Sequence, residues 1–217
     1  MLFKKHNIIV FAGDSVTDCG RVRPAGEGPF PTNPYGRGYA AFFAAYMHSC
    51  YPNLALRIIN QGQDGDCSSA LLARYNEIIR IKPNWMIIMI GINDVWRHFD
   101  CPYMREAHIN CTAYMRNVEE IIIRNNQENI RTILLSPFII EGNKSDPFRV
   151  MLGAYQDALA GLAEKYRLNY LDIQAGFDEL LQSLTSYELS QDRIHPNATA
   201  HMKIMLMLAK YIERSNI

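Results

Sequence analysis

The sequence predicts an α/β fold in which a parallel sheet is covered by helices on both faces. Short runs of β-forming residues alternate with longer segments whose apolar residues recur every three or four positions. This alternation is typical of parallel strands that are joined by helices. The chain has 217 residues, of which 48% are hydrophobic, so we expect one sizeable core and a single domain over residues 1–217.

Five apolar runs predict the strands, and we expect all five to be fully buried. In chain order they are residues 7–13, 56–60, 85–90, 132–135 and 169–172.

Helical periodicity fills the intervals between these strands. The predicted helices are residues 41–51, 67–81, 110–125, 148–166 and 198–214. Pro196 is available for the first turn of the last one.

The Gly- and Pro-rich segment 20–38 is longer than an ordinary connection between a strand and a helix. Connections of this length are often functional. The segment is therefore either one wall of a cleft or an ordered surface insertion, and the sequence leaves both interpretations open.

Charge and cysteine content limit the partners and the compartment. Lys plus Arg equals Asp plus Glu at 22 each, so neither nucleic acid nor an anionic membrane surface is expected, and the partner is predicted to be a small uncharged molecule. No segment approaches the roughly 20 apolar residues of a membrane helix. The 5 cysteines form no disulfide framework, which favours reduced thiols and a cytoplasmic location. A monomer and a homo-oligomer are both left open.

Candidate site residues follow three of the predicted strands. Ser15 follows the first strand, Gly62 the second and Asn93 the third. Ligands of open parallel sheets bind beyond the carboxyl ends of the strands, so these residues should converge at one edge. The stretch around Ser15 lacks the second glycine of G-x-S-x-G, which argues against the nucleophile elbow of the α/β-hydrolases. Taken alone, it is also a common turn sequence.

Asp192 and His195 are candidates for the carboxylate and the base. Their spacing of three lets one turn bring the carboxylate to the imidazole Nδ1, leaving Nε2 to face a serine. Pro196 biases His195 away from the α region, which keeps it at the entrance of the last helix. A helix-capping aspartate beside an exposed histidine is the alternative.

Gly62 and Asn93 are candidate donors to an oxyanion, through the backbone N–H and the side-chain amide respectively. The alternatives are a tight turn with positive φ at Gly62 and an Asx-turn or helix cap at Asn93. A serine hydroxyl alone is a weak nucleophile, so these residues gain meaning only as a set. As a set they predict a serine hydrolase.

The order Ser15, Gly62, Asn93, His195 resembles the SGNH (GDSL-type) esterase and lipase superfamily. Segments 13–21, 89–97, 137–143 and 192–196 look like the intracellular acetylxylan esterases of that superfamily, and the similarity covers essentially the whole chain. The resemblance implies a flavodoxin-like three-layer αβα sandwich around a five-stranded parallel sheet. Val16 replaces the leucine of the eponymous motif, a change that leaves the nucleophile untouched.

The resemblance also implies an activity, the removal of acetyl groups from acetylated xylo-oligosaccharides or related sugars. Ser15 would attack the ester carbonyl, His195 would take its proton, and Asp192 would orient the imidazole. The N–H groups of Ser15 and Gly62 and the Asn93 amide would hold the oxyanion. This chemistry requires no metal or organic cofactor.

Three aromatic residues after Asn93 are candidates for a sugar-stacking wall, with buried core as the alternative: Trp96, Phe99 and Tyr103. The same region contains four soft-metal ligand types whose spacing matches no zinc signature, so we expect no metal site there. They are His98, Cys101, His108 and Cys111.

Two kinds of alternative function remain open. The first is a carboxylesterase, lysophospholipase or thioesterase of the same superfamily that acts on a longer acyl group. The second is a non-catalytic carbohydrate-binding relative, against which the intact set of candidate residues argues. A nucleotide-binding domain is weaker still, because neither glycine-rich phosphate motif is present.

Overall fold

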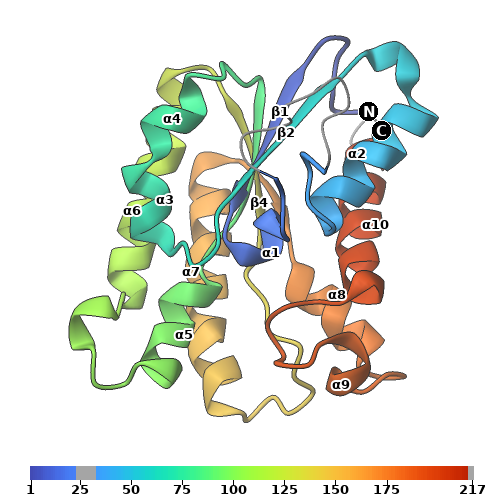
Figure 1. The fold of residues 1–217 in the computed structure, drawn as a ribbon. Helices are drawn as coiled ribbons and strands as arrows, with labels where there is room; N and C mark the ends of the chain where they lie inside the picture. The colour runs from blue at the N-terminus through green and yellow to red at the C-terminus, as the bar shows by residue number, and fades with distance from the viewer. Residues whose placement is uncertain (23–32, 215–217) are drawn as a thin grey trace.

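The predicted parallel sheet is present in the computed structural model, which describes residues 1–22 and 33–214. All five strands are parallel and lie in the order β2-β1-β3-β4-β5 (Figure 1). They are β1 (Ile8–Gly13), β2 (Arg57–Gly62), β3 (Trp85–Met89), β4 (Arg131–Leu135) and β5 (Asn169–Leu171). Each of the five runs predicted from the sequence is therefore a strand, with ends that differ by at most two residues.

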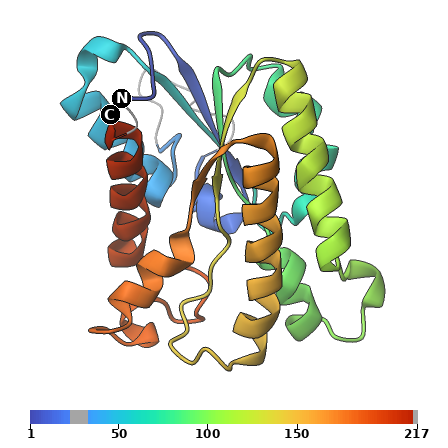
Figure 2. The same cartoon turned by 180° about the vertical axis from the view of Figure 1, so that it is seen from behind.

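Helices cover both faces of the sheet, as Figures 1 and 2 show from opposite sides. One face carries α2 (Tyr39–Cys50), α8 (Ile173–Leu180) and α10 (Ala198–Arg214). The other face carries α3 (Ser68–Ala73), α4 (Tyr75–Ile79), α5 (Ile92–Asp100), α6 (Cys111–Gln127) and α7 (Pro147–Tyr166). The short elements are α1 (Ser15–Asp18), α9 (Ser186–Leu189) and the 3₁₀ turns η1 (Pro52–Leu54) and η2 (Arg105–Ala107). The three-layer αβα sandwich is thus confirmed.

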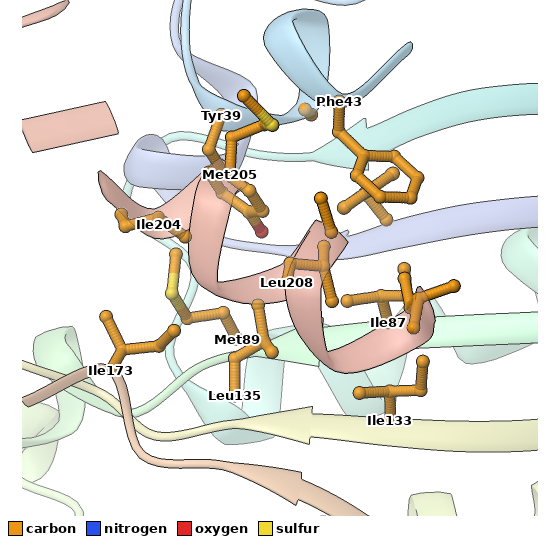
Figure 3. Close-up of a cluster of buried hydrophobic side chains, with 14 of the residues drawn as sticks. Tyr39, Phe43, Ile87, Met89, Ile133, Leu135, Ile173, Ile204, Met205 and Leu208 are labelled. Atoms are coloured by element: carbon orange, nitrogen blue, oxygen red, sulfur yellow. The ribbon is translucent and has the colours of Figure 1, made fainter. Parts of the chain in front are cut away.

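The two cores follow from the alternation of side chains along the strands. Ile87 and Met89 of β3 point to the face under α2, α8 and α10, where Leu208 packs on them (Figure 3). Met86 and Ile88 point to the opposite face and pack under α6 and α7. Because both faces of the central strands are covered, β3 is buried along its whole length.

The expectation of full burial is wrong for the outer strands. β2 and β5 form the two edges of the sheet. Alternate residues of β2 are partly or fully exposed, and all three residues of β5 are only partly buried. A strand at the edge has a neighbouring strand on one side only, so fewer residues surround its side chains.

The predicted helix over residues 67–81 is two helices, α3 and α4, which meet at Arg74. Pro196 lies before α10 rather than in its first turn, and the Ala200 N–H donates to the Asn197 side chain at 3.2 Å. The interpretation of segment 20–38 as a cleft wall falls mainly on residues 23–32, outside the described residues. Among the described residues no helix is both long and apolar enough to cross a membrane.

Candidate active site

Ser15 is the first residue of α1 and lies directly beyond the end of β1. Asp14 begins this short helix, because its Oδ1 accepts the Val16 N–H at 3.0 Å. Gly13 permits the tight passage from strand to helix, since a Cβ at this position would lie 2.3 Å from the Met89 carbonyl oxygen. The chain therefore presents the Ser15 hydroxyl at the carboxyl edge of the sheet without the G-x-S-x-G elbow.

A chain of hydrogen bonds runs from Ser15 to His195 to Asp192. Ser15 Oγ is 2.9 Å from His195 Nε2, and His195 Nδ1 is 2.6 Å from Asp192 Oδ2. Since Nδ1–H donates to the carboxylate, Nε2 is left to accept the hydroxyl proton. The three residues therefore have the geometry of a nucleophile, a general base and an orienting carboxylate.

Asp192 is held in its ionised form. Burial alone would raise the pKa of Asp192, but hydrogen bonds from the His195 ring and from the N–H groups of His195 and Ile194 outweigh it and hold the pKa well below its usual value. Ser190 Oγ donates a further hydrogen bond to Oδ1 at 3.0 Å. The carboxylate is thus fixed in position and stays charged at neutral pH.

Asn93 lies in the first turn of α5 and points into the same site. Its Nδ2 donates to the Asp66 carbonyl oxygen at 2.8 Å, and its exposed fraction is only 2%. The helix begins at Gly91 without a side-chain cap, so the Asx-turn and cap interpretations are wrong. One N–H of the Asn93 side chain is used in this hydrogen bond to Asp66. Because the amide is planar, the bond also fixes the direction of the second N–H.

The structure corrects the prediction for Gly62. Its N–H donates to Asn60 Oδ1 at 2.8 Å, and Gly62 is not among the residues that line the cavity at Ser15. Gly62 lacks positive φ, and glycine is required because a Cβ would lie 2.2 Å from the Asp18 nitrogen. The packing of α1 on β2, rather than a role at the oxyanion, explains this glycine.

Gly65, unlike Gly62, lies at the cavity. It lines the cavity beside Ser15 and Asn93, and its φ is 77°. Neither the Gly65 N–H nor the Ser15 N–H has an acceptor among the described residues. Two backbone donors and the Asn93 amide therefore border one cavity, which is the arrangement that an oxyanion requires. The stretch 60–65 already contained this second glycine, but spacing alone did not separate it from Gly62.

The cavity at Ser15 has a volume of 430 Å³. Its wall combines Trp96, whose ring centroid lies 5.7 Å from that of His195, with charged groups of Asp64 and Arg97. Phe99 does not line this cavity; it stacks on Phe148 beside a neighbouring one. Tyr103 was a candidate for the same aromatic wall, and the structure contradicts this, because it is 96% exposed and lines neither cavity.

Sequence analysis did not single out Cys19 and His201, which also line the cavity. The Tyr39 N–H donates to His201 Nδ1 at 3.2 Å, so Nε2 carries the proton and faces Cys19 Sγ at 3.4 Å. Burial lowers the pKa of His201 to about 4, and His195 adds to the effect. His201 is therefore a neutral, structural part of the cavity wall.

An ion pair ties the loops around Ser15 and Asn93 together. Arg74 Nε lies 2.5 Å from Asp66 Oδ2, and Arg74 Nη2 donates to the Gly13 carbonyl oxygen at 3.2 Å. The carbonyl of the same Asp66 orients Asn93. The Arg74 guanidinium thus links Gly13, which precedes the loop to Ser15, with Asp66, whose carbonyl holds the Asn93 amide.

Three of the four residues after Asn93 that could bind a soft metal are instead hydrogen-bonded to backbone carbonyl oxygens through their side chains. The Nε2 atoms of His98 and His108 lie 3.4 Å and 3.0 Å from backbone carbonyl oxygens. The Cys111 thiol donates to a third carbonyl. In the described part of the chain no cluster of three or more His, Cys, Asp or Glu side chains could hold a metal ion.

Replacing Asp14 by Asn is expected to change how stability depends on pH. Burial raises the pKa of Asp14 to about 7, with Asp94 and Asp66 adding to the effect, whereas an unfolded aspartate titrates near about 3.9. Between these two pH values Asp14 is protonated in the folded state and ionised in the unfolded state. The free energy of unfolding therefore falls as pH rises through this interval. Asn caps the helix equally well and does not ionise. The variant should gain stability relative to the parent between about pH 4 and about pH 8, measured by chemical denaturation. Identical pH profiles for the two proteins would contradict this assignment.

Comparison with known proteins places this site in a family. Residues 11–203 match the model of the GDSL-like Lipase/Acylhydrolase family. The chain is 40% identical over 195 residues to an acetylxylan esterase from Geobacillus stearothermophilus, covering 89% of this chain and 88% of that protein. The crystal structure of Axe2, an acetylxylan esterase from the same organism, superposes with a TM-score of 0.92 at 38% identity over 98% of this chain and 96% of that one. LAE5, an α/β hydrolase enzyme from the metagenome of Lake Arreo in Spain, gives 0.94 at 36% identity over 100% of both chains.

The chain belongs to the GDSL-like lipase/acylhydrolase family, and it is a carboxylic ester hydrolase. Other solved forms of Axe2 are described as catalytic mutants in which a serine, an aspartate or a histidine is replaced by alanine. These are the residue types of Ser15, Asp192 and His195.

Proposed function

We propose that this protein removes acetyl groups from acetylated xylo-oligosaccharides through an acyl-enzyme on Ser15. The observation that carries the mechanism is the hydrogen-bonded chain of Ser15, His195 and Asp192 beside a cavity of 430 Å³. The choice of substrate is supported by the relatives described as acetylxylan esterases and, for one form of Axe2, as an acetyl-xylooligosaccharide esterase.

In the proposed reaction Ser15 Oγ attacks the ester carbonyl carbon while His195 Nε2 takes the hydroxyl proton. The carbonyl oxygen becomes an oxyanion, which accepts hydrogen bonds from the N–H groups of Ser15 and Gly65 and from Asn93 Nδ2. His195 then protonates the departing sugar oxygen, and the acetyl group stays on Ser15. A water molecule that loses its proton to His195 attacks the acetyl carbon. His195 then returns that proton to Ser15 Oγ as its bond to the acetyl carbon breaks, which releases acetate and restores Ser15.

The wall of the Ser15 cavity favours a short acyl group. Among its lining residues Trp96 and Pro196 are the larger apolar side chains that are partly exposed, Val16 is only 2% exposed, and the remainder includes Asp64 and Arg97. A long alkyl chain would displace water from these charged groups without replacing its hydrogen bonds. An acetyl group is small enough to avoid them, and a sugar can hydrogen-bond with them.

We also propose a cytoplasmic location, where short acetylated oligosaccharides would be the available form of the substrate. The five cysteines support this proposal, since all five are free thiols.

A series of aryl esters of increasing acyl length tests the short acyl preference. The value of kcat/KM should fall roughly tenfold to a hundredfold from acetate to butyrate, because overpacking a rigid site costs about 1 to 3 kcal/mol. Soluble acetylated xylo-oligosaccharides should also be better substrates than polymeric acetylated xylan. Equal or rising activity toward octanoate would make the protein a long-chain esterase that uses the same three residues, and the acetylesterase proposal would then be wrong.

A further inference from the structure

A second cavity adjoins the one at Ser15. It has a volume of 290 Å³ and lies between the end of α5, the start of α7 and the segment that carries Asp192. In Figure 1 α5 and α9, which precedes the segment with Asp192, lie in the lower part of the view, below α1. Trp96 lines both cavities, so a ligand that passes over its ring would occupy both.

One wall of the second cavity is aromatic. Phe99 stacks on Phe148 with ring centroids 5.0 Å apart and an interplanar angle of 23°, and Phe99 is 40% exposed. Trp96 is half-buried and continues this wall toward His195. An exposed ring supported by a second ring provides a rigid flat surface, which suits the C–H face of a sugar ring.

The polar groups of this cavity favour a neutral ligand with many hydroxyl groups. Asp100 and Asp146 supply carboxylates that can accept further hydrogen bonds, whereas Arg193 supplies one guanidinium. The carboxylate of Asp192 also borders this cavity, but His195, Ile194 and Ser190 already donate to it. Arg193 is already paired with Asp146 at 3.0 Å, so little positive charge is left to attract an anion. Carboxylates accept hydrogen bonds, and sugar hydroxyls donate them. Within the described residues these carboxylates do not form a metal-binding group.

We propose that the second cavity is a subsite for the pyranose unit next to the acetylated one. The acetylated unit lies over Ser15, the chain crosses Trp96, and the neighbouring unit stacks on Phe99 with its hydroxyl groups toward Asp100 and Asp146. This proposal rests on the proposed function, because it concerns how the same oligosaccharide is bound. It assigns a preference for chain length, which the reaction at Ser15 does not require.

The test compares kcat/KM for an acetylated xylose glycoside, acetylated xylobiose and acetylated xylotriose that carry the acetyl group at the same position of the same terminal unit. The parent protein should prefer the disaccharide to the monosaccharide by roughly tenfold, through a lower KM, with little further gain for the trisaccharide. Phe99→Ala should reduce this ratio to near one, and Phe99→Tyr should restore it. Val150→Ala is the matched control, since Val150 is 61% exposed on α7 and does not line the cavity.

Phe99→Leu covers the case in which the alanine variant does not fold, because leucine keeps apolar packing on Phe148 but lacks a flat ring. A parent protein that does not distinguish monosaccharide from disaccharide would overturn the subsite. A Phe99→Ala or Phe99→Leu variant that keeps the full disaccharide preference would do the same. If the parent cleaves aryl acetate but none of the acetylated sugars, the proposed substrate itself is wrong, which is a distinct result.

Discussion

Ser15→Ala and His195→Ala are each expected to lower kcat by about 10⁴- to 10⁶-fold, and the double variant should be no worse than either single one. Ser15 and His195 form one proton-transfer unit across a 2.9 Å contact, so the loss of either removes the function of both. Steady-state kinetics with an aryl acetate measures the effect.

The controls for these variants are circular dichroism and thermal unfolding, which should match those of the parent protein. Two single effects that multiply in the double variant would contradict a shared proton-transfer step. A well-folded Ser15→Ala variant that keeps more than a small fraction of kcat would show that another group is the nucleophile.

Asn93→Ala is expected to lower kcat by about 10²- to 10³-fold with KM nearly unchanged. The Asn93 amide should hydrogen-bond the oxyanion more strongly than the ground-state carbonyl, so its removal is felt mainly in the transition state. Asn93 also holds the Asp66 carbonyl at 2.8 Å, and the stability of the variant must therefore be measured alongside its kinetics.

A defect chiefly in KM would instead make Asn93 a residue that positions the substrate. A large loss of stability together with a small kinetic effect would limit Asn93 to holding the Asp66 loop in place.

The sequence predicted the sheet well because the signal is local. A buried parallel strand is a short apolar run, and β3 is such a run on its own. Full burial failed for β2 and β5, because position in the sheet depends on the order of strands, which no single run reveals. The break between α3 and α4 at Arg74 was also missed, because the apolar periodicity of the sequence continues through this position. The Arg74 side chain contacts Asp66 and Gly13, and the sequence pattern does not show these contacts.

The sequence likewise predicted some residues of the site correctly and others not. Ser15, Asp192 and His195 come together as expected from strand ends and from a spacing within one turn. Gly62 was preferred to Gly65 because it directly ends a strand, yet the direction of an N–H depends on backbone angles that spacing does not encode.

The aromatic residues after Asn93 were taken as one wall, and the structure separates them. Trp96 lines both cavities, Phe99 lines only the second, and Tyr103 is exposed. The path of the chain after α5 decides which rings face the cavities, and no periodicity in the sequence reports it.

Mass spectrometry of the protein after rapid acid quenching from a reaction with an aryl acetate tests the central proposal most directly. A covalent acetyl group should appear on the peptide that contains Ser15, and it should be absent from the Ser15→Ala variant. An acetyl group on a different residue, with the Ser15 peptide unmodified while turnover continues, would contradict the assignment of Ser15 as the nucleophile.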